Sequence, residues 1–361
     1  MGLASRRVLA SRLRAKQRKI ALVRPNMFAA NRIVKHLTTS HSHGKKVKTA
    51  TVFYDKQNAV LGRALEKEFR KKRVKTQALG LIGSDSVSGK GYLKSLRKPA
   101  RAEAVVFLAS DMKQKYEDLH NFLIKSAEDR RKTFRGTRFA DIYGMNNTRM
   151  RRVLTLDSLS LINMRKFTGK TFEALQGSRE IKVSTSNGTN VVFILSPRIK
   201  WAKDNGILSK NYWGNLPAGE VFTAPMSVNG RIVIDGFSFG LGNLANNPIT
   251  VLVKNGRAIL SSVKCTNLKI KQKFIQQLLK DKNSSRIGEL GFGTNVGIKK
   301  EHGSILIDEK IPGIHIAFGD PLSGDTKARW KSDQHNDSII TKPTVIVDGR
   351  KIMQKGKSLL K

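Results

Sequence analysis

The stretch DEKIPGIHIAFGDPLSGDTKARWKSDQHND, residues 308–337, holds two of the chain's seven histidines, His315 and His335, close to a dense set of carboxylates. Imidazole and carboxylate groups that lie side by side can act as joint ligands to one divalent cation. Taken alone, His315 is equally compatible with a buried core histidine, and the run His-Asn-Asp with a polar turn. Because both pieces fall within one strand-loop-strand segment, we interpret the stretch as a metal site.

The spacing of residue types supports this interpretation. GIHIAFG, residues 313–319, alternates as a half-buried strand does. Its bulky apolar residues point to one side, and His315 points to the other side together with alanine and glycine, where a cleft has room to open. If the segment around His335 is also extended, the same period of two places His335 and Asp337 on one face.

Length and charge limit the classes of protein to consider. The chain has 361 residues, and since single cores stop growing near ~250–300 residues, we expect two domains. Its 68 basic and 27 acidic residues give a formal net charge of +41, spread along the whole chain. Such a surface would attract polyanions non-specifically and in a salt-dependent way. No zinc finger, RNP-like motif or basic helix with base-reading spacing is present, so specific nucleic-acid recognition is not indicated.

The first segment of the chain differs from the rest. Residues 1–26 form a basic extension, and the first acidic residue of the chain is Asp55. This start resembles a transit peptide, or it is an extension upstream of a start at Met27. The chain has no apolar run of 18 or more residues, so no membrane span is expected. The single cysteine, Cys265, cannot form an internal disulfide, which favours a cytoplasmic location, with an organelle as the alternative.

Residues 27–177 carry the pattern of a parallel α/β layer, because predicted strands and helices alternate. The predicted strands are residues 48–55, 74–81 and 102–110, and the predicted helices are residues 27–37, 58–73, 115–132 and 161–177. The last helix ends at Gly177, as helices often do. We therefore predict an N-terminal α/β domain.

Residues 178–361 change to the pattern of hairpins. Four segments place Asn-Gly or Asp-Gly between β-branched runs, the strongest short-range hairpin signal: residues 180–195, 227–235, 249–260 and 344–353. One helix is expected at residues 271–280. The fold class predicted for the whole chain is α/β plus α+β, with a C-terminal domain that is mostly antiparallel β and contains the metal site.

A glycine-rich segment in the first domain is a weak match to a phosphate-binding loop. GSDSVSGKGY, residues 83–92, has five residues rather than four between Gly83 and Gly89. Gly91 follows Lys90 where a serine or threonine would bind magnesium. We predict no nucleotide site there.

Two further carboxylates stand out because glycine surrounds them, Glu220 in NLPAGEVFTAP and Glu289 in GELGFGTN. Glycine lets the backbone approach a ligand closely, so a lone acid inside such a loop is well placed to hold a cation. With His315, His335 and Asp337 they form a set of oxygen and nitrogen ligands suited to zinc, cobalt or manganese, and large enough for two ions.

The order of these motifs resembles the aminopeptidase T-like, or thermophilic aminopeptidase, family of metallopeptidases, over residues 27–357. The resemblance implies a two-domain, usually dimeric exopeptidase that holds a pair of divalent metal ions. It implies that the metal ligands are Glu220, Glu289, His315, His335 and Asp337. Glu309, in the same motif as His315, would orient a ligand; a surface ion pair with Lys310 is the alternative for it.

The implied activity is removal of N-terminal amino acids from peptides with a free N-terminus, through a water activated by metal, with Glu220 or Glu289 as general base. Family peptidases carry a tyrosine shortly after the position of His315, and residues 319–330 contain none. A mononuclear Fe(II) dioxygenase that opens dihydroxypyridine rings is therefore the alternative on the same scaffold. A third hypothesis is a nucleic-acid-binding protein that has kept an enzyme scaffold.

Overall fold

The computed structural model contains two compact units. The described residues are 26–35, 37–38, 47–81, 102–110, 119, 123, 138–144, 158–207 and 212–360. The first unit comprises Met1–Leu156 with Ile207–Leu216, and the second comprises Asp157–Gly206 with Pro217–Lys361. Among the described residues, no helix combines the length and the apolar character that crossing a membrane requires.

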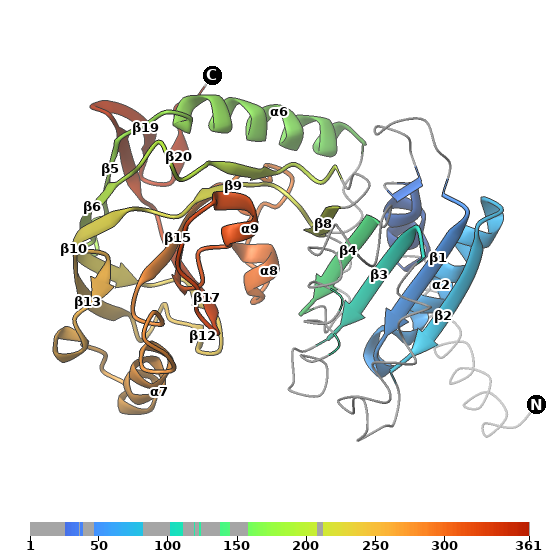
Figure 1. Cartoon of the computed structure of the whole chain (residues 1–361), viewed down its shortest axis with the longest axis horizontal. Helices are drawn as coiled ribbons and strands as arrows, with labels where there is room; N and C mark the ends of the chain where they lie inside the picture. The colour runs from blue at the N-terminus through green and yellow to red at the C-terminus, as the bar shows by residue number, and fades with distance from the viewer. Residues whose placement is uncertain are drawn as a thin grey trace, which may run out of the picture. The chain divides into compact units, whose positions relative to one another are not determined.

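The first unit is built on one parallel sheet, in agreement with the predicted α/β layer (Figure 1). Its strands, in spatial order, are β2 (Lys75–Gly80), β1 (Thr49–Tyr54), β3 (Ala104–Ala109), β4 (Arg138–Tyr143) and β8 (Tyr212–Asn215). Every neighbouring pair is parallel. Residues 26–35 and 37–38 are helical, and helix α2 (Ala59–Lys71) follows β1, as the sequence predicts.

Helix α2 packs closely on the strand that precedes it. Leu61, Leu65 and Phe69 recur every four residues and are fully buried, so one face of the helix is apolar. A Cβ atom on Gly62 would lie 2.5 Å from the ring of Tyr54 in β1, which only glycine avoids. The amphipathic pattern and this glycine together place α2 against the sheet.

Three predictions for the N-terminal half lie outside the described residues. They are the basic extension at residues 1–25, the segment 83–92 with its weak phosphate-loop pattern, and most of the predicted helix at residues 115–132.

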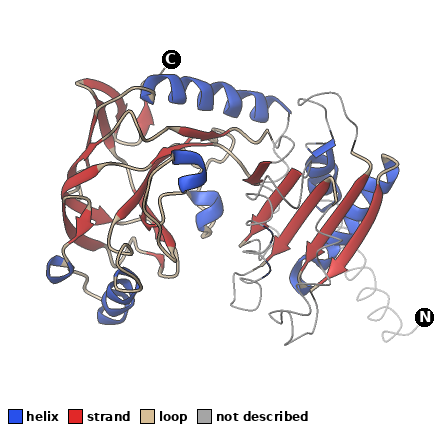
Figure 2. Ribbon diagram, in the orientation of Figure 1, coloured by secondary structure: helices blue, strands red, loops and turns tan. Residues whose placement is uncertain are grey.

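The second unit contains two antiparallel sheets and confirms the predicted β-rich half (Figure 2). Sheet B has the order β14 (Arg257–Ala258), β13 (Ile249–Lys254), β10 (Ser227–Ile234), β6 (Asn190–Ile194), β5 (Glu180–Ser184), β18 (Thr344–Val347), β19 (Arg350–Gln354) and β20 (Lys357–Ser358). Sheet C has the order β12 (Gly242–Asn243), β11 (Phe237–Ser238), β17 (His335–Ile340), β16 (Gly313–Gly319), β15 (Ile287–Gly293), β9 (Glu220–Thr223) and β7 (Ala202–Asp204). The helices of this unit are α6 (Ser158–Leu175), α7 (Leu268–Leu278), α8 (Ile305–Asp308) and α9 (Ser323–Thr326).

One apolar core joins the two sheets. Strands of sheet B contribute residues such as Phe193 and Ile232, and β16 of sheet C contributes Ile314, Ile316 and Phe318. The bulky residues of β16 therefore point into the core, which confirms the predicted alternation. The other face of sheet C is left for the polar residues that alternate with them.

Three of the four predicted hairpins are confirmed. The β5–β6, β13–β14 and β18–β19 pairs are antiparallel neighbours joined by the predicted Asn-Gly or Asp-Gly. Asn255 and Gly256 have φ angles of 50° and 79°, and Asp348 and Gly349 have 46° and 84°. Positive φ at both central residues is what a two-residue hairpin turn of type I′ requires.

The prediction of a hairpin at residues 227–235 is wrong. Asn229 and Gly230 lie inside the continuous strand β10, which pairs with β6 and β13. Gly230 has a φ of 134°, and a Cβ there would lie 2.3 Å from the carbonyl oxygen of Asn190. Here glycine permits close approach of two strands, a use that the dipeptide signal does not separate from a turn.

Asp55 links two strand ends of the first unit and generates a stability prediction. Its buried carboxylate accepts hydrogen bonds from the backbone N–H of Asn58 at 3.0 Å and of Ser110 at 2.6 Å. We expect Asp55→Ala to lower the free energy of unfolding by about 2–4 kcal/mol, because it removes a helix cap and leaves buried donors unpaired. Urea denaturation measures this. Ser110→Ala, which removes only one hydroxyl donor, should cost about 1 kcal/mol; equal losses would contradict the assignment.

Candidate metal centre

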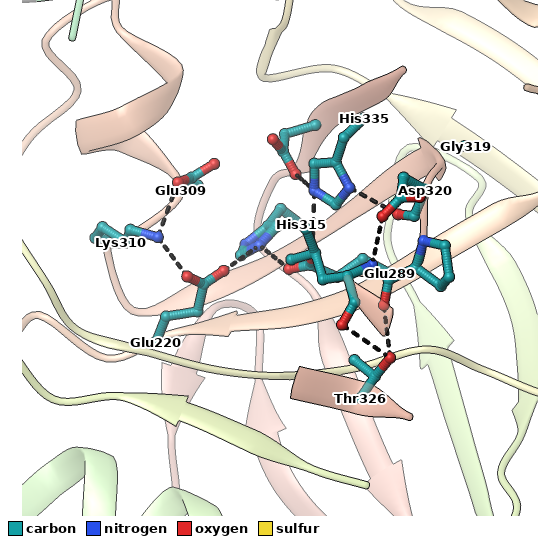
Figure 3. A network of polar contacts seen from close by, with 12 residues as sticks. Glu220, Glu289, Glu309, Lys310, His315, Gly319, Asp320, Thr326 and His335 are labelled. Carbon is teal, nitrogen blue, oxygen red and sulfur yellow. Dashed lines mark hydrogen bonds and ion pairs between the residues drawn. The ribbon is translucent and has the colours of Figure 1, made fainter. Parts of the chain in front are cut away.

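The five predicted ligands lie together on one face of sheet C. Glu220 begins β9, Glu289 lies on β15, His315 on β16, and His335 and Asp337 on β17. These four strands are direct neighbours in the sheet. Residues directly opposite in antiparallel strands point to the same face, and the register places all five on the face opposite the apolar core. Figure 3 labels four of them, Glu220, Glu289, His315 and His335.

Small residues stand beside each ligand on this face. Glu220 is paired with Gly293, His315 with Gly291, Glu289 and Asp337 with Ala317, and His335 with Gly319. The imidazole of His315 lies over Gly291, where a Cβ atom would be 2.0 Å from its Nε2 atom. The prediction of a glycine loop is therefore wrong for Glu289, which lies inside β15, whereas Gly219 does precede Glu220 in a loop. Most of these glycines belong to strands, and they leave room for the ligands of the neighbouring strand.

An irregularity in β15 sets the direction of Glu289. Ile287 is paired with Phe318 and Glu289 with Ala317. The chain therefore advances two residues along β15 for one residue along β16. The extra residue is Gly288. A β-bulge of this kind shifts the alternation by one residue, and it turns Glu289 to the polar face while Ile287 stays in the core.

Short distances join the ligands into two groups that share Glu289. The Nε2 atom of His315 lies 2.7 Å from Oε1 of Glu220 and 3.1 Å from Oε1 of Glu289. The Nε2 atom of His335 lies 3.1 Å from Oε2 of Glu289 and 3.2 Å from Oδ1 of Asp337. Glu289 thus directs one carboxylate oxygen to each histidine.

This donor set fits divalent metal ions. In each of two groups, Glu220–Glu289–His315 and Glu289–His335–Asp337, ligand atoms lie within 4.8 Å of one another. Within the described part of the chain, the buried atoms Glu289 Oε2 and His315 Nδ1 have no partner in hydrogen-bonding geometry. Three carboxylates buried together are costly unless cations balance them, and two divalent ions would do so.

The second nitrogen of His335 is held by the backbone. Its Nδ1 atom lies 2.8 Å from the carbonyl oxygen of Asp320 and donates to it. With the proton on Nδ1, the lone pair on Nε2 is available to a metal ion. Ligand histidines in proteins are commonly oriented by a second hydrogen bond of this type.

A buried lysine extends the cluster, and the sequence pattern assigns it no functional role. Lys310 Nζ forms an ion pair with Oε2 of Glu220 and lies 2.9 Å from Oε1 of Glu309. The expected ion pair between Glu309 and Lys310 is therefore present, but both residues are buried, so its expected place at the surface is wrong. A lysine beside a metal-ligand motif is expected to be solvated, and no spacing signal marks it as buried.

The same contacts shift the pKa values of the cluster. Burial favours the neutral form of Glu220, but the charge of Lys310 and hydrogen bonds from His315 outweigh it and lower the pKa to about 2. Burial likewise disfavours the charged form of both histidines, yet the neighbouring carboxylates raise the pKa of His315 and His335 well above the ordinary value. Burial raises the pKa of Glu309 to about 8.

A family comparison agrees with this geometry. The family model for thermophilic metalloproteases (M29) matches residues 164–357, which include all five ligands and the whole of sheet C. The chain belongs to the thermophilic metalloprotease (M29) family. Members of this family are metalloproteases, which supports both the predicted metal dependence and the predicted class of hydrolase. No curated protein sequence matches the chain.

Two solved structures have the same fold as this metalloprotease. AmpT from Thermus thermophilus superimposes with a TM-score of 0.66, at 15% sequence identity, covering 92% of this chain and 99% of that one. A 2,5-dihydroxypyridine dioxygenase from Pseudomonas putida KT2440 gives a TM-score of 0.65, also at 15% identity, covering 93% and 97%. At this identity the likeness establishes the fold, and the chemistry has to be argued from the site.

The position of Gly291 generates a prediction for metal binding. Gly291→Ala should displace the His315 imidazole, because the new Cβ would lie 2.0 Å from Nε2. We expect metal affinity to fall at least about tenfold, within the range seen when a ligand loses its orientation, as measured by titration of metal-free protein. Gly169→Ala in α6 is the matched control, since no atom lies within 4 Å of its added Cβ. Equal affinity of the Gly291 variant and the parent would contradict the placement of His315.

The raised pKa values of the histidines predict a pH dependence. At pH 7 both imidazoles are expected to be cationic in the metal-free protein, with a proton on each ring nitrogen, because their pKa values are raised well above 6.5. Metal ions must displace these protons, so affinity should rise with pH, by up to about 100-fold per pH unit when two protons leave. Calorimetric titration in two buffers with different ionisation enthalpies counts the protons released. The His335→Ala variant should release one proton fewer. Metal binding without proton release would contradict the raised pKa values of the two histidines.

Proposed function

We propose that the protein is a two-metal aminopeptidase that removes N-terminal amino acids from peptides. The observation that carries this proposal is the position of Glu289, which faces one histidine with each carboxylate oxygen. A carboxylate between two complete groups of ligands is suited to bridge two ions. The family match supports peptide substrates, and the specificity for a free N-terminus follows from the resemblance to aminopeptidase T-like enzymes.

Each residue of the cluster has a place in this proposal. Glu220 and His315 would hold one ion, His335 and Asp337 the other, and Glu289 would bridge them. Bound divalent ions would polarise the scissile carbonyl and lower the pKa of a water molecule. Zinc, cobalt and manganese all suit ligands of this composition.

Two further roles are orientation of a ligand and acceptance of the proton from the water molecule. Glu309 and Glu220 are both ion-paired to Lys310, so Glu309 would orient Glu220 through the lysine, the role predicted for it. Glu220 and Glu289 have lowered pKa values and are ionised at neutral pH. An ionised carboxylate can accept a proton, and either glutamate remains the proposed general base.

The dioxygenase alternative needs one Fe(II) ion held by two histidines and one carboxylate, such as His315, His335 and Asp337. One observation is in its favour: residues 213–361 contain no tyrosine. The glutamates Glu220 and Glu289 are unnecessary for that reaction. The number and type of metal ions therefore separate the two functions.

Metal removal and reconstitution test the proposal. Chelation should abolish hydrolysis of aminoacyl amides and short peptides. Addition of zinc, cobalt or manganese should restore it, because carboxylate and imidazole ligands bind all three ions reversibly. Elemental analysis of the active protein should find two ions per chain. Glu289→Gln should bind fewer ions and lose at least about 100-fold in rate, since it removes a charge shared by both groups.

Three results would count against the proposal. Full activity after exhaustive chelation, with metal shown to be absent, would exclude a metal-dependent peptidase. One iron per chain, together with consumption of oxygen on a dihydroxypyridine, would favour the dioxygenase. N-terminally acetylated peptides cleaved as fast as free ones would exclude an aminopeptidase.

A further inference from the structure

A cavity of about 590 Å³ opens in the second unit beside the metal centre. Four isoleucines of its lining are here called its floor: Ile311 and Ile339, which are partly exposed, and the buried core residues Ile314 and Ile340. Five lysines stand around it: Lys299, Lys300, Lys342, Lys355 and Lys357. We call this cavity, defined by these five lysines, the lysine pocket. Of its lining residues, Glu309 alone has a role in the proposed metal chemistry.

The lysine pocket adjoins the metal centre through two residues. Ile339 lines the pocket and is the direct partner of His315 across the β16–β17 pair, a pairing that brings their Cα atoms within about 5.5 Å. Glu309 also lines the pocket, and its carboxylate lies within 4.8 Å of ligand atoms of His315 and Asp337. These two residues place the edge of the pocket beside the ligands, so we expect a peptide bound at the metal centre to reach it within a few residues, since an extended residue spans about 3.3 Å.

Two acids that line the pocket are already satisfied by their own donors. Asp235 accepts hydrogen bonds from the side chain of Asn187 at 2.6 Å and from the N–H and hydroxyl of Thr341 at 2.8 and 2.7 Å. Asp308 accepts from three successive backbone N–H groups, those of residues 302–304. These carboxylates do not pair with the lysines.

The lysines themselves have no such partners. All five are exposed, and none of their side chains forms an ion pair or a hydrogen bond with any residue that the structure describes. Two further acids line the pocket: Glu301 is exposed and accepts a hydrogen bond from Asn243 at 3.3 Å, and Glu309 is ion-paired with Lys310. The five lysines exceed the four acids of the lining, Glu309 is in addition balanced by Lys310, and the lysines are the exposed charges without a partner. A concave site with an excess of one charge attracts the opposite charge. The ligand indicated is an anion that also has apolar surface.

We propose that the lysine pocket binds carboxylate groups of the peptide substrate, so that the enzyme prefers peptides that are acidic after their first residue. This inference rests on the proposed peptidase function and names its substrate class. The carboxylate comes either from an aspartate or glutamate side chain or from the C-terminus of a short peptide. Both have the same chemistry, and the apolar floor would pack against the intervening side chains.

The experiment compares amidated peptides that begin with leucine and carry glutamate or glutamine at the second, third or fourth position. We expect kcat/KM to be about tenfold higher for a glutamate peptide at the best position, the order expected for a few exposed ion pairs. The preference should shrink in 0.5 M salt, which screens exposed charges. The glutamine peptides with a free C-terminal carboxylate form the second arm and separate the two sources of charge.

Matched variants separate the pocket from the overall charge of the protein. The pocket variant Lys342→Gln, Lys355→Gln, Lys357→Gln should lose the glutamate preference and keep the rate on leucine amide. The control variant Lys254→Gln, Lys264→Gln, Lys269→Gln removes the same charge from exposed lysines that do not line the pocket, and should keep the preference. An equal loss in both variants would overturn the pocket assignment.

Binding to metal-free protein keeps this inference separate from the peptidase proposal. Fluorescence anisotropy of a labelled glutamate peptide should show tighter binding than the glutamine peptide, and the pocket variant should abolish the difference. One combination of results would overturn this inference alone. The enzyme would cleave leucine amide, but the glutamate, glutamine and free-acid peptides would have equal kcat/KM values and would bind equally well. Absence of cleavage for every substrate after metal reconstitution overturns the peptidase proposal, while the binding result still decides whether the pocket takes carboxylates.

Discussion

The candidate centre depends on one steric constraint: small side chains must leave space for the ligands on one face of sheet C. Neighbouring strands lie about 4.8 Å apart, so five ligand side chains on four adjacent strands can converge only where the residues beside them are small. On at least one side of each ligand the register places glycine or alanine, and at Gly291 even one methyl group would collide with His315. The apolar core on the other face fixes the register, because a slip by one residue would exchange the two faces.

Burial of charge is the second constraint, and it explains why Lys310 is inside the protein. Three ligand carboxylates and Glu309 lie together away from water, and an unbalanced group of this kind would be strongly destabilising. Lys310 pairs with Glu220 and Glu309, and the histidines are held as cations by the neighbouring carboxylates. Divalent ions would replace the protons on the histidines. The metal-free and metal-bound centres would thus be balanced by different cations in the same cluster of acids.

The sequence predicts the parts of this centre that depend on alternation along a strand, and fails where the answer depends on another strand. The period of two correctly separates His315 from the core residues of β16 and places His335 beside Asp337. It does not predict that Gly288 forms a bulge that turns Glu289, since a bulge is defined only against its partner. For the same reason Asn229-Gly230 reads as a turn, although it lies inside β10, and Lys310 reads as solvated, although tertiary contacts bury it.

The absence of tyrosine from residues 213–361 constrains how the proposed reaction could proceed. A phenolic hydroxyl near the centre would be available to stabilise negative charge as it develops on the substrate, and here the second unit has none. Thr326, the nearby hydroxyl drawn in Figure 3, donates to the carbonyl of Pro321 and is buried. Lys310 is already paired with two carboxylates. Within this unit, the proposed ions would be the groups that stabilise that charge, and Glu289, which belongs to both groups of ligands, would help to hold them.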